Sequence, residues 1–379
     1  MINNRISGLS LFANVGIGET YLSSFGIDIT VANELLEDRS KFYKFLHPQT
    51  DVVCGSICDI DVLNTLIYKA KEAKCDFILA TPPCQGMSLA GKKNPFDERN
   101  SLVKYVVTMI NVLEPNWVIL ENVPSVLKTK IMFKNEPILI PEYLTACLSD
   151  RYRINYKVLN AADYGTPQVR RRAIFLISKN TMDEWHFPKE EEKITVEEAI
   201  GHLPSLMPSS KGEVYPPEKD VNSPEEKVNS KTSYHYAKKH NEQHIKIMSH
   251  TPTGMSAFDN VDEEYTPRKN GKRIKGYNTT YKRMRWDAPA PTITMSNGAI
   301  SSQNNVHPGR LNEDGTYSDP RVLTLKEIFI LTGLPDDWSP PSWAEEPLIR
   351  KVIGEALMPE LVKRLVKNMP SIKDTGKEK

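Results

Sequence analysis

The sequence has little cysteine, no long hydrophobic run and almost no net charge. Its five cysteines among 379 residues are an odd number, which favours reduced thiols over a disulfide framework. No apolar run approaches the roughly 20 residues that a membrane-spanning helix needs, which excludes such a helix. The first residues also lack the charged start and apolar middle of a secretory signal, so we expect a cytoplasmic protein.

The near balance of charge, 49 Lys and Arg against 48 Asp and Glu, taken alone argues against a nucleic-acid partner. The charges are nevertheless segregated along the chain. Residues 183–228 carry twelve acids and five lysines, whereas residues 268–285 carry eight bases and no acid. Tyr277, Tyr281 and Trp286 are interleaved with those bases, which is typical of a surface that contacts phosphates and stacks on bases. A solvated loop is an equally good interpretation of this run by itself.

Short apolar runs alternate with helical patterns over the first 180 residues, which indicates an α/β domain with a parallel sheet and helices on its faces. The strands are expected at 8–12, 29–32, 76–80, 117–120, 156–159 and 173–177. Apolar residues at helical spacing predict helices over 63–70 and 102–113, the second with Ser101 as its N-cap. The chain then becomes acidic and proline-rich, which indicates a second domain or a large insertion.

Small, polar and reactive residues follow several of these strands, and the carboxyl ends of strands line the ligand crevice of an open α/β sheet. The turn from Phe12 to Gly18 favours a close approach of the backbone to a nucleotide-like ligand. Glu34 follows the next strand, where an acid commonly accepts hydrogen bonds from ribose hydroxyls. The two loops together suggest an adenosine-containing cofactor, although Glu34 alone could equally cap a helix.

Three further loops carry candidate catalytic groups. Cys84 follows two prolines on a loop, a position that favours a nucleophile over the small buried hydrophobe that a lone cysteine more often is. Glu121 follows the strand at 117–120, where we expect a proton donor. Gln168, Arg170 and Arg172 alternate, so an extended segment would turn all three to one face as a clamp for an anion or a carbonyl. Simple protection of a strand edge is the alternative.

These motifs occur in the same order in DNA cytosine-5 methyltransferases, which the chain resembles. The segments that carry the resemblance are 12–18, 33–34, 82–85, 97–102, 121–123, 168–172, 283–294, 323–327 and 353–356. It omits mainly residues 180–282, where that family keeps its variable target-recognition region. It implies a Rossmann-like, S-adenosylmethionine-dependent methyltransferase domain over 1–180 and 348–379, and a smaller target-recognition domain over 181–347.

The resemblance implies roles for individual residues. Cys84 resembles the nucleophile that adds to carbon 6 of a flipped-out cytosine, and Glu121 the group that protonates N3. Arg170 and Arg172, with Gln168, resemble the residues that hold the base and organise the active site. The residues implied to bind the cofactor, S-adenosyl-L-methionine, are Phe12, Asn14, Gly16, Glu34, Leu35, Ser56, Ile57, Pro83, Leu102 and Glu355. Those implied to contact DNA are Ser88, Lys92, Arg99, Arg268, Lys269, Lys272, Arg273, Lys275, Arg283 and Arg285.

The chain departs from the family's pattern around the cofactor. Asn14 and Ile17 stand where the family usually has glycine; asparagine tolerates a left-handed backbone, whereas isoleucine does not. Ser56 replaces an aspartate that binds the adenine amino group, and Glu355 replaces an asparagine of the closing motif. The contacts of the last two positions with the cofactor therefore stay open.

The resemblance also implies duplex DNA as the partner, a monomeric enzyme, a separately encoded restriction endonuclease, and neither a membrane nor a metal. The histidines between 235 and 250 match no zinc-binding spacing. Two alternatives stay open, a transfer-RNA cytosine-5 methyltransferase with the same architecture and a catalytically silent DNA-binding protein. Cys84, Glu121, Arg170 and Arg172 argue against the silent protein, which has no need of all four.

Overall fold

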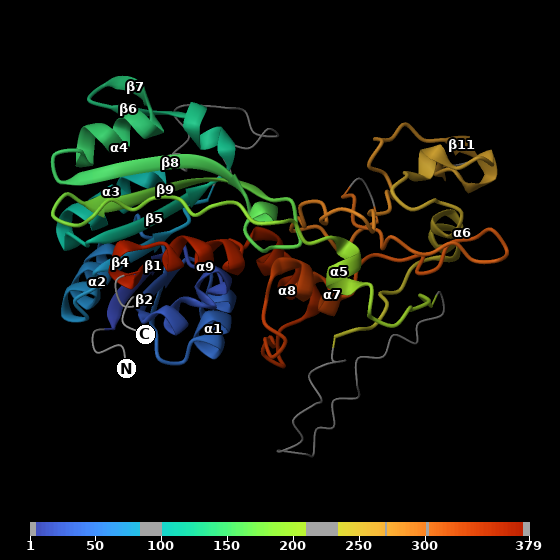
Figure 1. Ribbon diagram of the computed structural model, residues 1–379, viewed down its shortest axis with the longest axis horizontal. Helices are drawn as coiled ribbons and strands as arrows, with labels where there is room; N and C mark the ends of the chain where they lie inside the picture. The colour runs from blue at the N-terminus through green and yellow to red at the C-terminus, as the bar shows by residue number, and fades with distance from the viewer. Residues whose placement is uncertain (1–4, 84–100, 210–233, 270, 301–302, 374–379) are drawn as a thin grey trace, which may run out of the picture. The chain divides into compact units, whose positions relative to one another are not determined.

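The computed structural model of the chain describes residues 5–83, 101–209, 234–269, 271–300 and 303–373 (Figure 1). The contacts divide the chain into two units. The first comprises Met1–Tyr164, Arg171–Glu191 and Leu357–Lys379, and the second comprises Gly165–Arg170 and Glu192–Ala356. The chain therefore leaves the first unit twice and returns to it twice.

A seven-stranded sheet forms the centre of the first unit (Figure 1). Its strands, in spatial order, are β3 (Asp51–Cys54), β2 (Ile27–Glu34), β1 (Ile6–Leu11), β4 (Phe77–Ala80), β5 (Trp117–Asn122), β9 (Arg171–Lys179) and β8 (Tyr152–Asn160). The first five are parallel, whereas β9 is antiparallel to both β5 and β8. All six predicted strands are present, and the mixed sheet confirms the Rossmann-like class.

Two details of the predicted sheet are wrong. The strand β3 was not predicted. Only one of its four residues is buried, whereas all four residues of the equally short β4 are. The sheet is also not wholly parallel. Only the short 3-10 helix η5 (Ala161–Asp163) stands between β8 and β9, so the chain has no crossover helix there and β9 pairs antiparallel with β8.

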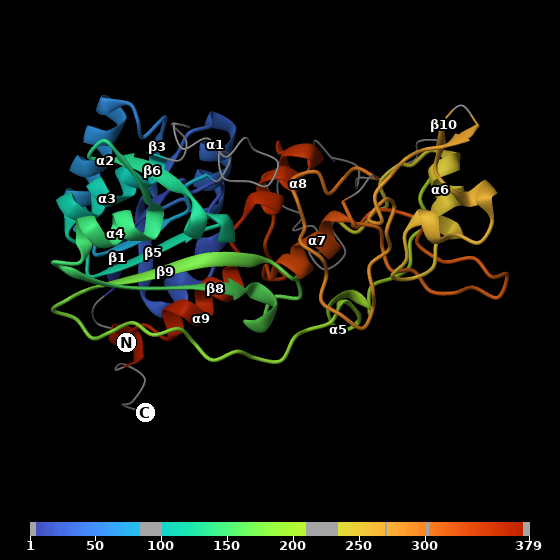
Figure 2. The ribbon, with the colours of Figure 1, turned by 90° about the horizontal axis from the view of Figure 1, so that it is seen from above.

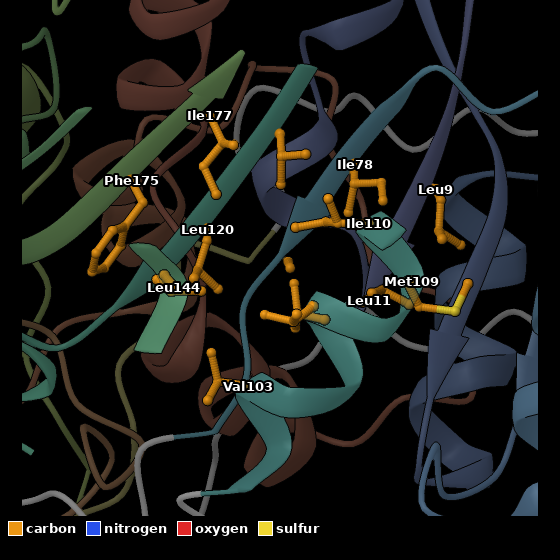
Figure 3. Close-up of a cluster of buried hydrophobic side chains, with 14 of the residues drawn as sticks. Leu9, Leu11, Ile78, Val103, Met109, Ile110, Leu120, Leu144, Phe175 and Ile177 are labelled. Carbon is orange, nitrogen blue, oxygen red and sulfur yellow. The ribbon is translucent and has the colours of Figure 1, made fainter. Parts of the chain in front are cut away.

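Helices cover both faces of the sheet (Figure 2). On one face lie α2 (Ile60–Glu72), α3 (Leu102–Leu113) and α4 (Ile140–Leu148). Their apolar stripes meet alternate residues of the strands in one buried cluster, part of which Figure 3 shows around Ile110 and Leu120. The other face is covered by α1 (Glu37–Leu46) and by α9 (Pro359–Lys367), whose Leu365 carbonyl accepts a 3.0 Å hydrogen bond from the Trp185 indole.

The predicted helices lie close to where the apolar periodicity placed them. The spacing at 63–70 corresponds to α2, which begins directly after its N-cap Asp59. The Asp59 side chain accepts hydrogen bonds from backbone N–H groups of the first turn. Ser101 occupies the N-cap position of α3 as expected, but its side chain forms no capping hydrogen bond. A small hairpin of β6 (Lys130–Phe133) and β7 (Glu136–Leu139) precedes α4, and α10 (Pro370–Lys373) follows α9.

Loops dominate the second unit, whose regular elements are short. They are α5 (Val196–Ile200), α6 (Glu242–Ser249), β10 (Arg268–Lys269), β11 (Lys272–Arg273), α7 (Leu325–Thr332) and α8 (Glu346–Glu355). A buried polar cluster supplements its apolar core: Arg321 Nη2 lies 2.7 Å from Asp319 and 2.8 Å from Glu327. Burial alone would raise the pKa of Glu327, but the neighbouring Arg321 and His307 lower it to about 2.

Among the described residues, no helix is long and apolar enough to cross a membrane.

Candidate active site

The turn after β1 adopts a left-handed backbone at three residues. The φ angle is 59° at Phe12, 51° at Asn14 and 78° at Gly16. A Cβ atom on Gly16 would lie 2.3 Å from His47 Nε2 and 2.9 Å from the Tyr43 ring, so this position requires glycine. Ile17 instead begins the 3-10 helix η1 (Ile17–Glu19) with its side chain buried. Ile17 therefore follows the left-handed positions of the turn, and its backbone does not need the conformation that isoleucine disfavours.

Glu34 ties this turn to the end of β2. Its Oε2 accepts a 2.9 Å hydrogen bond from the backbone N–H of Asn14, and its Oε1 accepts one of 3.0 Å from that of Leu36. Burial raises the pKa of the carboxyl, and these backbone hydrogen bonds and Arg39 lower it in part. The carboxylate is therefore held at a fixed position beside the turn.

The loop after β3 is drawn to the same edge by Asn33. Its Nδ2 donates to the carbonyl oxygens of Val53 and Gly55 at 2.9 and 3.0 Å. The following Ser56 accepts a 3.2 Å hydrogen bond from Cys58 N at its Oγ, and Ile57 is only 2% exposed. Leu35, one residue beyond β2, is 61% exposed. The structure therefore brings Glu34, Leu35, Ser56 and Ile57 to neighbouring strand ends.

The proline loop after β4 is connected to both adjacent strand ends. Thr81 Oγ1 donates to the Phe12 carbonyl at 3.0 Å, and Asn122 Nδ2 donates to the Pro82 carbonyl at 3.0 Å. Pro83 ends the segment described here, and Leu102 begins α3 beyond it. The predicted nucleophile Cys84 and the predicted DNA contacts Ser88, Lys92 and Arg99 lie outside the described residues.

An ion pair joins the ends of β5 and β9. Arg172 Nε lies 2.6 Å from Glu121 Oε1, and the two side chains are 15% and 10% exposed. Glu121 is paired with Ile174 across the antiparallel strands, so Arg172 lies two residues along on the same face. The register of β5 with β9 therefore brings a carboxylate and a guanidinium together at the edge where the proline loop begins.

Gln168 and Arg170, the other two residues of the predicted clamp, form hydrogen bonds with backbone segments of the second unit. Both are buried in the second unit. Arg170 donates to the carbonyl oxygens of Ile293 and Gly354 at 3.0 and 2.9 Å. Gln168 donates to the Leu331 carbonyl at 3.2 Å and accepts from Ile293 N at 3.0 Å. Their polar groups hold backbone segments of the second unit, which also contains Glu355 at the end of α8.

A family model for C-5 cytosine-specific DNA methylases matches residues 6–371. The chain belongs to this family. It is a DNA (cytosine-5-)-methyltransferase, and the family uses S-adenosylmethionine as methyl donor and acts on DNA.

Relatives match this C5 methylase along almost its whole length. It is 43% identical over 373 residues to the Type II methyltransferase M1.HgaI of Avibacterium volantium, covering 97% of this chain and 99% of that one. It is 27% identical to M.DdeI of Desulfomicrobium norvegicum, covering 95% and 88%.

Solved structures show the same fold. A putative DNA modification methyltransferase encoded within an Escherichia coli prophage has a TM-score of 0.66 at 18% identity, covering 97% of this chain and 99% of that one. DNMT2 of Spodoptera frugiperda has a TM-score of 0.56 at 15% identity, covering 96% and 99%.

The basic run of the methylase forms a small hairpin in the second unit. Arg268 stands opposite Arg273, and Lys269 stands opposite Lys272, in the antiparallel pairing of β10 with β11. Arg268 lies 2.7 Å from Glu263, and the Arg273 guanidinium lies 5.2 Å from the centre of the Phe258 ring. The two lysines and the nearby Lys275 are exposed.

Arg283 was predicted to contact DNA, and this prediction is wrong. The residue is fully buried in the second unit of the methylase, where it donates to the carbonyl oxygens of Met248 and His307 at 2.9 and 2.7 Å. Burial lowers the pKa of its guanidinium to about 9. Arg283 is thus part of the core, whereas Arg285 is 65% exposed and pairs with Asp287.

Glu19, a buried acid next to the turn after β1, was not predicted from the sequence. Its carboxylate accepts hydrogen bonds from the hydroxyls of Ser10 and Tyr43. Burial raises the pKa of Glu19 to about 7, although both hydrogen bonds lower it in part. The only signal in the sequence is an acid two residues after Ile17 in a glycine-rich turn, which by itself is typical of an exposed helix start.

Proposed function

We propose that this methylase transfers a methyl group to carbon 5 of a flipped-out cytosine in a specific duplex DNA sequence, through a covalent Cys84 adduct at carbon 6. The Glu121–Arg172 ion pair carries the proposal. It holds a carboxylate at the end of β5, and Asn122 of the same strand donates a hydrogen bond to Pro82 in the loop that leads to Cys84. Family membership supplies the reaction class.

Cys84 and Glu121 would perform the first steps of the reaction. The Cys84 thiolate bonds to carbon 6, and the displaced electron pair moves through the ring to N3, where Glu121 in its protonated form would deliver a proton. Arg172 orients that carboxyl. The resulting enamine is nucleophilic at carbon 5, and bound S-adenosylmethionine supplies the electrophilic methyl group. A base, such as a water molecule, then removes the carbon 5 proton, and elimination breaks the bond to Cys84. Glu121 takes back the N3 proton as the aromatic ring is restored.

The residues at the ends of β1 to β3 fit the cofactor. The backbone of the turn is left-handed at Phe12, Asn14 and Gly16, and the buried Glu34 beside it would accept hydrogen bonds from ribose hydroxyls. Leu35 and Ile57 would contact the adenine ring. The flanking Pro83 and Leu102 would add contacts. Ser56 and Glu355 complete the proposed set of cofactor-binding residues. We assign Gln168 and Arg170 the task of positioning the backbone segments to which they are hydrogen-bonded.

We assign DNA recognition to the second unit and catalysis to the first. At the hairpin of β10 and β11, like charges stand directly opposite each other, which costs free energy in isolation and is relieved by phosphate. The proposed phosphate contacts are Arg268, Lys269, Lys272, Arg273 and Lys275, together with Ser88, Lys92 and Arg99. The extrusion of the cytosine follows from the chemistry, because neither carbon is accessible within a duplex.

The names of the relatives point to a role in a restriction-modification system. Both are named Type II methyltransferases, so we propose that the chain is the modification enzyme of a restriction-modification system. It would act in the cytoplasm as a monomer, with the restriction endonuclease encoded separately.

Bisulfite sequencing of plasmid DNA from cells that express the protein tests the proposal. We expect 5-methylcytosine at one recurring sequence in these cells and none there in cells that express Cys84→Ser. Methylation of transfer RNA and not of plasmid DNA would instead identify the transfer-RNA enzyme. Plasmid DNA without any added 5-methylcytosine would contradict the proposed function.

A further inference from the structure

A groove of about 370 Å³ opens on the second unit, and the proposed reaction does not use it. It is lined by Thr253, Gly254, Met255, Arg285, Trp286 and Asp287. Met255 is 44% exposed, and the side chains of Arg285 and Asp287 are 65% and 67% exposed. The groove therefore combines an apolar surface with an accessible charged pair.

The Arg285 guanidinium is held side-on by Asp287. Arg285 Nε donates to Asp287 Oδ1 at 2.8 Å, and Nη2 donates to Oδ2 at 2.6 Å. This geometry uses Nε and one N–H of Nη2. The remaining N–H groups, on Nη1 and on the other side of Nη2, point away from the carboxylate. Arg285 thus presents a parallel pair of donors in a fixed direction.

The stem of Arg285 is also held close to the backbone. Gly254 has a φ of 78°, and a Cβ atom added there would lie 3.0 Å from Arg285 Cγ. Gly254 N donates to the Met284 carbonyl at 3.1 Å, which fixes this loop next to the arginine. A side chain held at both its stem and its head loses little further conformational entropy on binding.

Trp286 forms a rigid wall of the groove. Its indole N–H donates to the Gly309 carbonyl at 2.8 Å. The Arg310 guanidinium lies 4.5 Å from the centre of its ring and is itself bound by Glu197 at 2.7 Å. The wall is therefore set before any ligand arrives.

The charge of the pair decides between a phosphate and a base as its ligand. Asp287 cancels the charge of Arg285 and would repel a phosphate placed nearby, which disfavours a backbone contact. Two parallel N–H donors match the N7 and O6 acceptors that guanine presents in the major groove. We propose, on the basis of the proposed function, that Arg285 reads a guanine of the target sequence, with Asp287 as its positioning residue.

Base-modified duplexes test this reading in the complete enzyme. Once bisulfite sequencing has defined the target, each of its guanines is replaced in turn by 7-deazaguanine, which lacks the N7 acceptor. We expect one position at which the substitution lowers kcat/KM of the wild-type enzyme by roughly 10- to 100-fold. At that position Arg285→Lys, which lacks the planar fork, should discriminate much less between guanine and 7-deazaguanine.

A second experiment compares variants in cells. Arg285→Ala and Asp287→Asn should relax the methylated sequence at that one guanine, whereas the control Lys275→Ala, at a proposed phosphate contact, should lower methylation evenly at all sites. The inference is overturned if no guanine is sensitive, or if Arg285→Lys keeps the full sensitivity of the wild type. A wild-type enzyme that methylates no DNA would contradict the proposed function instead.

Discussion

Arg172 holds Glu121 by a 2.6 Å ion pair across two antiparallel strands, with both side chains largely shielded from water. The register of β5 with β9 therefore sets the position of the proposed proton donor. A carboxylate held in this way loses little orientation when a base arrives, which is what proton transfer to N3 requires.

Removal of the proton donor should slow chemistry without loss of cofactor binding. We expect Glu121→Gln to lower the single-turnover rate of methyl transfer by roughly 10²- to 10⁴-fold. Arg172→Ala should also slow it, because the carboxyl is no longer oriented. The matched control is Arg171→Ala, next along β9 and exposed. A rate of Glu121→Gln equal to that of the wild type would exclude Glu121 as the proton donor.

The buried carboxylate at the end of β2 should determine cofactor affinity. Replacing Glu34 with alanine removes an ionised acceptor for two ribose hydroxyls, and we expect about 2–4 kcal/mol less binding free energy. Calorimetric titration with S-adenosylmethionine measures this loss. Glu37→Gln changes an exposed acid of α1 and serves as the control. Unchanged affinity of Glu34→Ala would refute the assignment of the ribose site.

Glu19 should make the stability of the fold depend on pH. Its pKa is about 7 in the folded chain, because of burial, against an ordinary value of 4.5. The folded state thus binds more protons between these values, so the free energy of unfolding should fall as pH rises from about 4.5 to 7 and then level off. The total decrease is on the order of 3 kcal/mol.

Denaturant unfolding at several pH values checks this dependence. Glu19→Gln cannot ionise and should lose most of the slope, whereas Glu72→Gln, on the exposed face of α2, should keep it. A slope that persists in Glu19→Gln would show that another group is responsible.

DNA binding should depend steeply on salt despite a net charge of only +1. Each phosphate contact contributes about 0.9 to the slope of log affinity against log salt concentration. We expect the double variant Lys269→Ala, Lys272→Ala to reduce this slope by about 2, as measured by fluorescence anisotropy. Lys71→Ala, on α2 of the first unit, is the control. An affinity of the wild type that is insensitive to salt would contradict the phosphate surface.

The fold was predictable where apolar periodicity is long and regular. The runs that became β1, β4 and β5 and the stripe of α3 carry enough buried side chains to show their period. The strand β3, with one buried residue, does not. The antiparallel direction of β9 depends on the short connection from β8 and not on any pattern within either strand.

The candidate site was predictable as a set of residue types, but their tasks depend on tertiary contacts. Glu121 and Arg172 meet because of strand register, which no local motif encodes. Arg283 belongs to the same basic run as Arg285, yet one is buried among carbonyl oxygens and the other is exposed. Charge along the sequence marks a basic region and does not show which guanidinium faces solvent.

Covalent trapping detects the proposed Cys84 adduct itself. A duplex in which 5-fluorocytosine replaces cytosine allows Cys84 to add and the methyl group to transfer, but fluorine at carbon 5 prevents the final loss of a proton. With S-adenosylmethionine present, we expect a stable protein–DNA adduct that mass spectrometry locates on Cys84, and no adduct with Cys84→Ser. If wild-type protein that methylates ordinary DNA forms no adduct, or is linked through another residue, the proposed mechanism is contradicted.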